Sequence, residues 1–220
     1  MKLLVVIIVI VAIAAGAGFS IWSQTAESPQ PVAQQLPGPA KPATSPFAFV
    51  PGQSPSYGNM MARVVVHEWL DPECEGCRAM HPIFKKIVTD YSDQALFVVR
   101  YMPLHKNSLY AAAVLEEARE LEKFNEALDI LFEKQPEWGS HRDPRPQLIP
   151  TYLEHLGIPR EKMERSYVVQ KHGAKIKRDE DDAVRAGVTG TPSFFVNGRK
   201  VPARSEDALR RAIETALAHR

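Results

Sequence analysis

The chain contains very little cysteine. Its 220 residues include only two, Cys74 and Cys77. Two cysteines can form one disulfide at most, which excludes the multi-disulfide framework of small secreted folds. Their C-x-x-C spacing is therefore more informative than their number.

The chain also lacks an excess of charge of either sign. Its 27 lysines and arginines nearly balance 26 aspartates and glutamates. Nothing in this balance favours nucleic acid or an anionic surface as a partner. A hydrophobic content of 45% is ordinary for a globular protein, and the length allows one domain with extensions.

Charge is absent from Leu3–Trp22, an apolar run of 20 residues. About 20 apolar residues can cross a bilayer as a helix, and Trp22 would lie at the far interface. We favour an uncleaved anchor within residues 1–22 over a cleaved signal peptide, which Ala15-Gly16-Ala17 would also permit. Lys2 favours a cytoplasmic N-terminus, so both interpretations export the rest of the chain to the periplasm or cell exterior.

Residues 23–62 hold eight prolines and almost no charge. Such a composition cannot bury a core and predicts a disordered, extended linker. Phe47, Phe49 and Tyr57 leave open that its later part packs on a domain. The linker would hold that domain near the membrane.

The folded part is predicted over residues 63–220. Val64–Leu70 is apolar on both parities, as in a central strand buried on both faces. A helix follows from about Glu75 to Val88, and Ala95–Tyr101 is the next strand. The default for this β-α-β unit is a parallel pair with a right-handed crossover.

A helical block follows, and a hairpin and a final helix end the chain. The break within the block is expected at 135–147. Asn197-Gly198 between two apolar segments, Ser193–Val196 and Lys200–Val201, predicts a type I′ hairpin, and Ser205 is the expected N-cap of the last helix. The expected helices of the block are 108–121, 123–134, 147–156, 160–171 and 173–186.

The C-x-x-C sits between a buried strand and a helix, which places Cys74 at a helix N-terminus. The unpaired N–H groups and the helix dipole favour the thiolate there, and the thiolate is the form that attacks disulfides. Cys77, one turn inside, is the expected resolving thiol. Two purely structural thiols would not be expected in a polar loop.

Metal binding is the alternative from another functional class. Cys74, Cys77, His81 and His67 could supply ligands for zinc or copper, with Met80 as a further copper ligand. The second C-x-x-C or H-x-x-H half of a closed structural site is absent. We therefore predict no resident metal, and a metallochaperone remains the second hypothesis.

These motifs together resemble the DsbA-type branch of the thioredoxin superfamily, over about Val64 to Ala218. The resemblance implies an α/β thioredoxin-like fold with a helical subdomain inserted at about 108–187, preceded here by a transmembrane helix. It rests on the C-x-x-C, on the Gly187-Val188-Thr189-Gly190-Thr191-Pro192 segment before the hairpin, on Tyr101-Met102-Pro103-Leu104-His105, and on Lys123-Phe124 to Leu131-Phe132.

The resemblance also implies roles for single residues. Glu68 would lie beneath the disulfide and relay protons, and Pro192 would be a catalytic-site cis-proline packed against the disulfide. The backbone of Thr191 would pair with substrate, with Glu75 and Gly76 as further substrate contacts. The residues alone leave three alternatives open. Glu68 could face solvent, it could form an ion pair with Arg100, and the peptide bond before Pro192 could be trans.

The loop departs from the most oxidising members, which carry a histidine between the cysteines. Asp71, Glu73 and Glu75 place three carboxylates near Cys74, and these oppose thiolate formation. We therefore predict that Cys74 is less acidic than in the strongest oxidants and that the couple is less oxidising.

The sequence predicts a membrane-anchored, extracytoplasmic thiol:disulfide oxidoreductase without a cofactor beyond its own Cys74–Cys77 disulfide. An oxidase is favoured, and isomerase or reductase use stays open. Expected partners are protein thiols and disulfides, together with a membrane redox partner that recycles the dithiol. The linker has no heptad pattern, so a monomer is expected.

Overall fold

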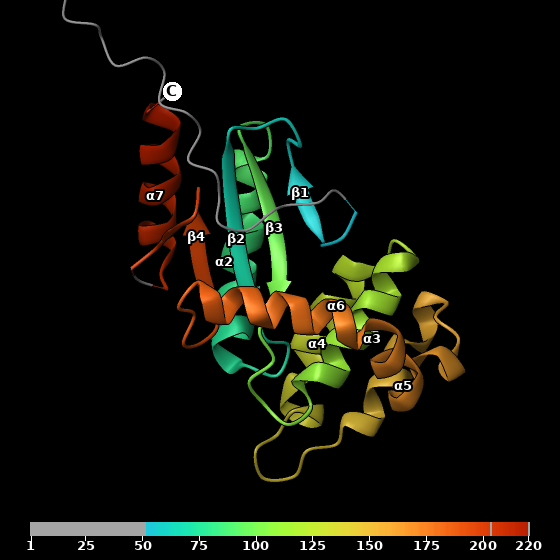
Figure 1. The fold of residues 1–220 in the computed structure, drawn as a ribbon. Coiled ribbons are helices and arrows are strands. Elements are labelled where there is room, and N and C mark those ends of the chain that lie inside the picture. The colour runs from blue at the N-terminus through green and yellow to red at the C-terminus, as the bar shows by residue number, and fades with distance from the viewer. Residues whose placement is uncertain (1–51, 203, 220) are drawn as a thin grey trace, which may run out of the picture. The chain divides into compact units, whose positions relative to one another are not determined.

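The computed structural model describes residues 52–202 and 204–219. Its sheet has the order β1-β3-β2-β4-β5 (Figure 1). The predicted central strand is confirmed, because β2 pairs in parallel with β3 and antiparallel with β4. The strands are β1 (Ser56–Gly58), β2 (Val64–Leu70), β3 (Ala95–Tyr101), β4 (Ser193–Val196) and β5 (Arg199–Lys200).

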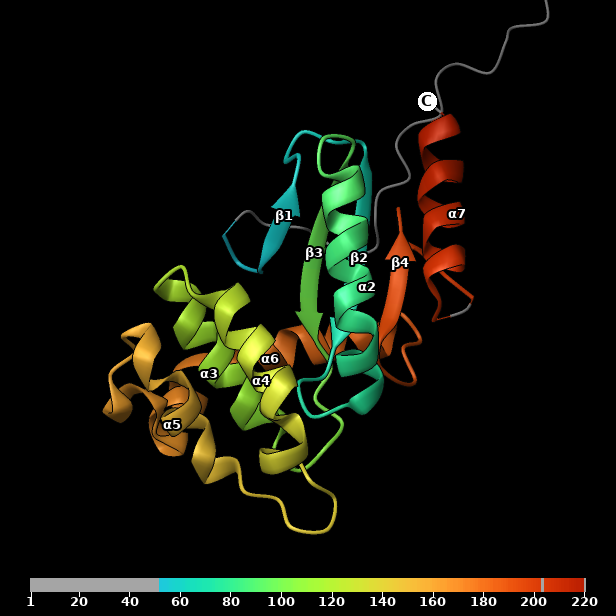
Figure 2. The ribbon, with the colours of Figure 1, turned by 180° about the vertical axis from the view of Figure 1, so that it is seen from behind.

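Helices cover both faces of the sheet. Helices α2 (Glu75–Tyr91) and α7 (Glu206–Ala218) pack on one face, and α6 (Arg165–Arg185) crosses the other (Figures 1 and 2). This arrangement explains why β2 is apolar on both parities, since side chains alternate between the faces. Val66 belongs to the main core, whereas Trp69 packs in a smaller cluster with Phe195.

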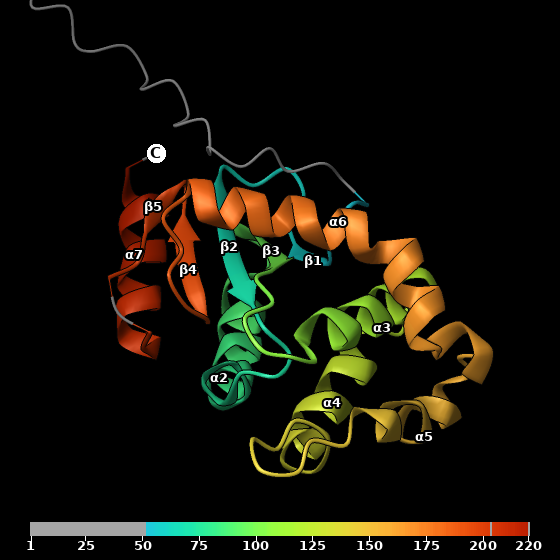
Figure 3. The same cartoon turned by 60° about the horizontal axis from the view of Figure 1, so that its bottom comes forward.

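The helical block lies between β3 and β4, at the carboxyl ends of β2 and β3 (Figure 3). Its elements fall where the insertion at 108–187 was predicted. They are α3 (Ser108–Glu120), α4 (Phe124–Trp138), η1 (Pro146–Leu148), α5 (Ile149–Leu153), η2 (Glu154–Leu156), η3 (Arg160–Met163) and α6.

Two expected helix boundaries are wrong. Helix α6 runs through Gly173 without a break, because one interior glycine costs only about 1 kcal/mol and both His172 and Ile176 are anchored in the interior. Helix α4 continues past Pro136 to Trp138. There the buried Trp138 indole donates to the Leu131 carbonyl at 2.8 Å, which holds the last turn.

The end of the predicted disordered linker is ordered, which corrects the boundary at residue 62. β1 pairs antiparallel with β3, and the Tyr57 hydroxyl donates to Asn125 Oδ1 at 2.6 Å. The segment covers the edge of β3, whose N–H and C=O groups would otherwise be unpaired. Residues 23–51 and the predicted membrane span lie outside the described residues. Within residues 52–202 and 204–219, no helix is long and apolar enough to cross a membrane.

The C-terminal hairpin turn and the cap are confirmed, but the second strand of the hairpin, β5, begins and ends one residue earlier than predicted, at Arg199–Lys200. Asn197 and Gly198 both have positive φ, at 47° and 78°, as a type I′ turn requires. Asn197 also exchanges two hydrogen bonds with Val65, at 2.8 Å each, which fixes the turn to β2. Ser205 accepts from the Ala208 N–H and caps α7. The segment before β4 is thereby held beside the end of β2.

We expect Gly58→Ala to lower the free energy of unfolding more than Gly157→Ala, as measured by denaturant titration. Both glycines have positive φ, which costs an alanine about 1–2 kcal/mol. Only at Gly58 would the added Cβ also clash with a backbone oxygen, that of Ala95, whereas the space around Gly157 is open. We expect a further loss of about 1–3 kcal/mol there. Equal losses would show that β1 contributes nothing to the stability of the sheet.

Candidate active site

The two cysteines occupy different environments at the start of α2. Cys74 is the N-cap residue with an extended backbone, and its sulfur is partly exposed. Cys77 lies in the first turn of the helix and is fully buried. The Asp71 N–H points at the Cys77 sulfur, 3.5 Å away. Solvent and a substrate can therefore reach only Cys74.

The Thr191–Pro192 peptide lies against the dithiol and is cis, as predicted. The Cys74 thiol donates to the Thr191 carbonyl at 3.4 Å. A Cβ added to Gly76 would lie 3.5 Å from both Cys74 Sγ and Pro192 Cδ. The glycine thus leaves the nucleophile and the Thr191 backbone uncovered by a side chain.

The environment shifts the two thiol pKa values in opposite directions. The hydrogen bond from the Cys77 thiol lowers the pKa of Cys74 to about 5, and backbone N–H groups of Cys77 and Gly76 act in the same direction. Burial raises the pKa of Cys77 well above its ordinary value, and the adjacent Cys74 adds to this. The pair is therefore arranged as a thiolate nucleophile backed by a thiol.

Glu68 is buried in β2, so the solvated alternative is wrong. Its side chain is 1% exposed, and burial raises the pKa of its carboxyl to about 8. The suggested pairing with Arg100 is also wrong, because Arg100 is in register with Trp69 and points to the opposite face. There Arg100 binds Asp179 at 2.8 Å.

Two of the three carboxylates expected to oppose the Cys74 thiolate are fully engaged elsewhere. Glu73 accepts from the Asn107 N–H at 2.6 Å and from its side-chain amide at 2.8 Å. Asp71 is paired with His105 at 2.7 Å. The expectation that Asp71 and Glu73 oppose formation of the Cys74 thiolate is therefore wrong, because both carboxylates are bound by other groups. The prediction itself stays open, since a pKa of about 5 lies between about 3.5 for DsbA and about 7 for thioredoxin.

Sequence reasoning missed the two histidines beside the dithiol. Partial burial disfavours charge on His105, but its bond to Asp71 outweighs burial and raises the pKa of His105. The rings of His105 and His141 are 5.9 Å apart, and His141 Nε2 lies 2.8 Å from Glu75. The position of His105 directly after β3 was the available signal. His141 lies in an irregular loop that carries none.

Gln135 is the other residue that the sequence did not reveal. Its side-chain amide donates to the carbonyls of Pro72 at 2.8 Å and Cys74 at 3.1 Å. It can reach them because α4 continues past its expected end at 134. The end of α4 thus fixes the backbone of the cysteine loop.

The suggested metal ligands do not converge. His81 pairs with Asp129 at 2.6 Å, and His67 lies on the other face of the sheet, near Trp69. Within the described ranges, no three His, Cys, Asp or Glu side chains come together to hold a metal ion.

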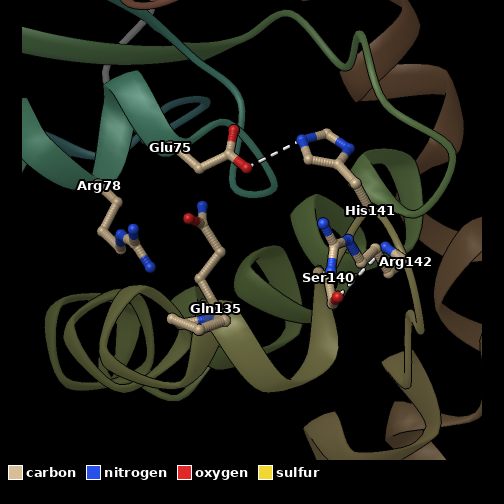
Figure 4. Close-up of a pocket in the computed structure, with 8 residues that line it drawn as sticks. Glu75, Arg78, Gln135, Ser140, His141 and Arg142 are labelled. Carbon is tan, nitrogen blue, oxygen red and sulfur yellow. Dashed lines mark hydrogen bonds and ion pairs between the residues drawn. The ribbon is translucent and has the colours of Figure 1, made fainter.

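A hollow of about 300 Å³ lies next to the cysteine loop. Figure 4 shows side chains from the start of α2 on one side and from the end of α4 and the following loop on the other. The hollow is lined by Glu75, Arg78, Gln135, Pro136, Gly139, Ser140, His141 and Arg142.

Comparisons with known proteins identify the fold and the family. A family model described as thioredoxin matches residues 51–215. Oxidised BdbD of Bacillus subtilis superposes with a TM-score of 0.67 at 25% identity, covering 76% of this chain and 94% of that one. Alpha-DsbA1 of Wolbachia pipientis has a TM-score of 0.69 at 20% identity. The superposition covers 80% of this chain and 96% of that one, which shows a shared fold.

The curated relatives are longer proteins. A Na⁺/H⁺ antiporter of Salinispora tropica is 34% identical over 147 residues, which cover 65% of this chain but 21% of the antiporter. A protein-disulfide oxidoreductase of Rickettsia prowazekii is 28% identical over 164 residues, covering 73% of this chain and 60% of that one. The chain thus matches about a fifth of the antiporter and three fifths of the oxidoreductase.

In the reduced protein, we expect the thiolate absorbance of Cys74 at about 240 nm to titrate with a midpoint near pH 5. Cys77→Ala should raise this midpoint by at least about one unit because it removes the hydrogen-bond donor, whereas Cys77→Ser should stay closer to the parent. A parent midpoint near the ordinary thiol value, or equal shifts in both variants, would contradict this account.

Proposed function

The chain belongs to the thioredoxin family, in its DsbA-like branch, and we propose that it acts as a protein thiol:disulfide oxidoreductase. The observation that carries the proposal is the opposed pair of thiols, one at a helix N-terminus and reachable, the other buried. The Thr191 backbone beside Cys74 supports binding of a substrate chain in extended form, as an added strand. The similarity to a Rickettsia protein-disulfide oxidoreductase points to the same activity.

The reaction begins with the oxidised protein. A substrate thiolate attacks Cys74 Sγ; a substrate–Cys74 disulfide forms, the Cys74–Cys77 bond breaks, and Cys77 leaves as a thiolate. A second substrate thiolate then attacks the substrate sulfur of the mixed disulfide. The substrate gains a disulfide, Cys74 leaves as a thiolate, and the protein holds the two electrons.

Glu68 supplies the proton that Cys77 needs. The buried Cys77 favours the thiol strongly, and the charge of a nearby Glu68 raises the pKa of Cys77 further. With its own pKa near 8, Glu68 carries a proton at neutral pH and can transfer it to the departing sulfur. In the reverse direction the Glu68 carboxylate takes that proton back.

We further propose that the forward direction, the donation of disulfides, is the main one. A Cys74 pKa well below that of an ordinary thiol stabilises the reduced form, which makes the disulfide a better oxidant. Isomerase or reductase use is the alternative, since the same sulfurs serve each direction. Acid trapping of thiols in cells decides between them: a mostly oxidised pair supports the oxidase, and a mostly reduced pair supports isomerase or reductase use.

We also propose that the protein acts outside the cytoplasm, anchored in the cytoplasmic membrane by its N-terminal segment. The support is the uncharged run Leu3–Trp22 and the proline-rich linker that follows. The antiporter relatives combine a segment similar to this chain with an ion-transport protein. Recycling would then fall to a membrane redox partner.

The direct test mixes oxidised protein with a reduced, unfolded substrate that has two thiols. We expect one substrate disulfide for each protein disulfide consumed, measured by thiol counting and mass spectrometry. Cys74→Ala should abolish transfer. Cys77→Ala, supplied as a preformed mixed disulfide with a small thiol, should form a stable mixed disulfide through Cys74 with a substrate that has a single thiol, because no second substrate thiol is there to release it. Transfer that survives Cys74→Ala would refute the mechanism.

Glu68→Gln tests the buried acid through stability as a function of pH. The folded protein keeps the Glu68 proton up to about pH 8, whereas the unfolded chain loses it near 4.5. Because the folded pKa is raised, the parent loses stability relative to Glu68→Gln as pH rises from 4.5 to 8, and the difference is constant above that. Each unit of pKa difference corresponds to about 1.4 kcal/mol.

Denaturant unfolding of the oxidised proteins measures this difference without thiol titration. A parent-to-variant difference that does not change between pH 4.5 and 8 would show that Glu68 is not protonated at neutral pH. The same variant should slow thiol transfer at neutral pH by about 100-fold, the low end of general acid–base contributions.

A further inference from the structure

The two flanks of Cys74 present different chemistry. On one flank lie the Thr191 carbonyl and the Pro192 ring, with Gly76 adding no side chain. These groups contact a substrate through its backbone and carry no charge. On the other flank lies the hollow of about 300 Å³, whose lining includes charged side chains from α2 and from the loop after α4 (Figure 4).

The hollow carries an excess of positive charge. Arg78 and Arg142 both line it, and within the described part of the chain neither guanidinium has a hydrogen-bond or ion-pair partner. The one carboxylate in the wall, Glu75, is held by His141 at 2.8 Å. Even with a neutral His141, the hollow contains two guanidinium groups against one carboxylate.

The positions of these groups are fixed by ordered elements. Arg78 lies one helical turn after Cys74, and its N–H donates to the Cys74 carbonyl at 3.1 Å. Ser140 Oγ accepts from the backbone N–H groups of Arg142 and Asp143, at 3.3 Å each, which shapes the loop that carries Arg142. Gln135 binds this side of the site to the cysteine loop.

We propose that this hollow binds carboxylate side chains that flank the cysteine of the substrate polypeptide. The inference rests on the proposed oxidoreductase function and names the class of substrate: segments with aspartate or glutamate next to the reactive cysteine. Guanidinium groups match carboxylates as paired donors.

The spacing supports a contact two or three residues from the substrate cysteine. Four residues of helix separate Cys74 from Arg78, a rise of about 6 Å. An extended chain covers about 3.3 Å per residue. A substrate strand that crosses Cys74 and leaves on the side away from Thr191 would therefore place its second or third residue over Arg78.

The test uses two peptides that differ only in charge. Each has one cysteine; one carries glutamates at the second and third positions on either side, and the other carries glutamines there. The measured quantity is the second-order rate constant of the reduced peptide with the oxidised full-length protein, at low and high salt. For each peptide, the rate of a variant is divided by the rate of the parent, which cancels the intrinsic reactivity of the peptide thiol.

We expect Arg78→Gln and Arg142→Gln to slow the acidic peptide about threefold each, and the double variant about tenfold. The glutamine peptide should react at the parent rate. The matched control is Arg178→Gln, which removes the same charge from an exposed site on α6, remote from the hollow. It should change neither peptide. The loss should shrink at high salt.

A second measurement separates this proposal from the proposed function. The same peptides with serine in place of cysteine cannot exchange, so their binding reports the hollow alone, for example by fluorescence anisotropy. Weaker binding of the acidic serine peptide to the double variant than to the parent supports the proposal. Equal binding, or equal slowing of both cysteine peptides, overturns it. Failure of both cysteine peptides to react with the parent would overturn the oxidoreductase function instead.

Discussion

The buried Asp71 is the constraint on which the site depends. Its carboxylate accepts from the Glu73 and Leu104 N–H groups and binds His105, while its backbone contacts both cysteines. A fully buried carboxylate is stable only when its acceptor positions are filled. Those partners come from the cysteine loop and from the segment after β3. The hydrogen bonds of the Asp71 side chain therefore join the ends of both central strands, and those of its backbone set where α2 begins.

The unequal chemistry of the two sulfurs follows from that placement. Because α2 begins at Cys74, the first sulfur faces unpaired N–H groups at a helix terminus, and the second lies one turn deeper, where water is excluded. The same burial that keeps Cys77 protonated also raises the pKa of Glu68 on the neighbouring strand. A thiolate, a thiol and a carboxylic acid thus coexist near neutral pH.

What the sequence could predict was set by local signals. The two central strands matched residue for residue because their apolar runs are bounded by clear breaks, and the hairpin followed from Asn197-Gly198. Three of the failures involve interactions between distant segments, whereas the break expected at Gly173 failed because α6 tolerates one interior glycine. Pro136 was expected to end a helix, but Trp138 and Gln135 find partners that extend it. The linker was expected to stay disordered, yet β1 pairs with an edge that only the folded sheet provides. Arg100 was suggested as a partner of Glu68 because the two lie on neighbouring strands. Side chains alternate between the faces of the sheet, however, so Arg100 lies on the other face and binds Asp179.

The carboxylates around Cys74 show why composition is a poor guide to electrostatics at such a site. Asp71, Glu73 and Glu75 all lie within three residues of the nucleophile. Glu73 turns to the start of α3, and Glu75 turns outward to His141. Each charge is therefore opposed by donors from another segment before it can act on the thiol. The groups left without a counter-charge on that side are the guanidinium groups of Arg78 and Arg142, so an approaching substrate meets a positive surface that the local sequence would not have suggested.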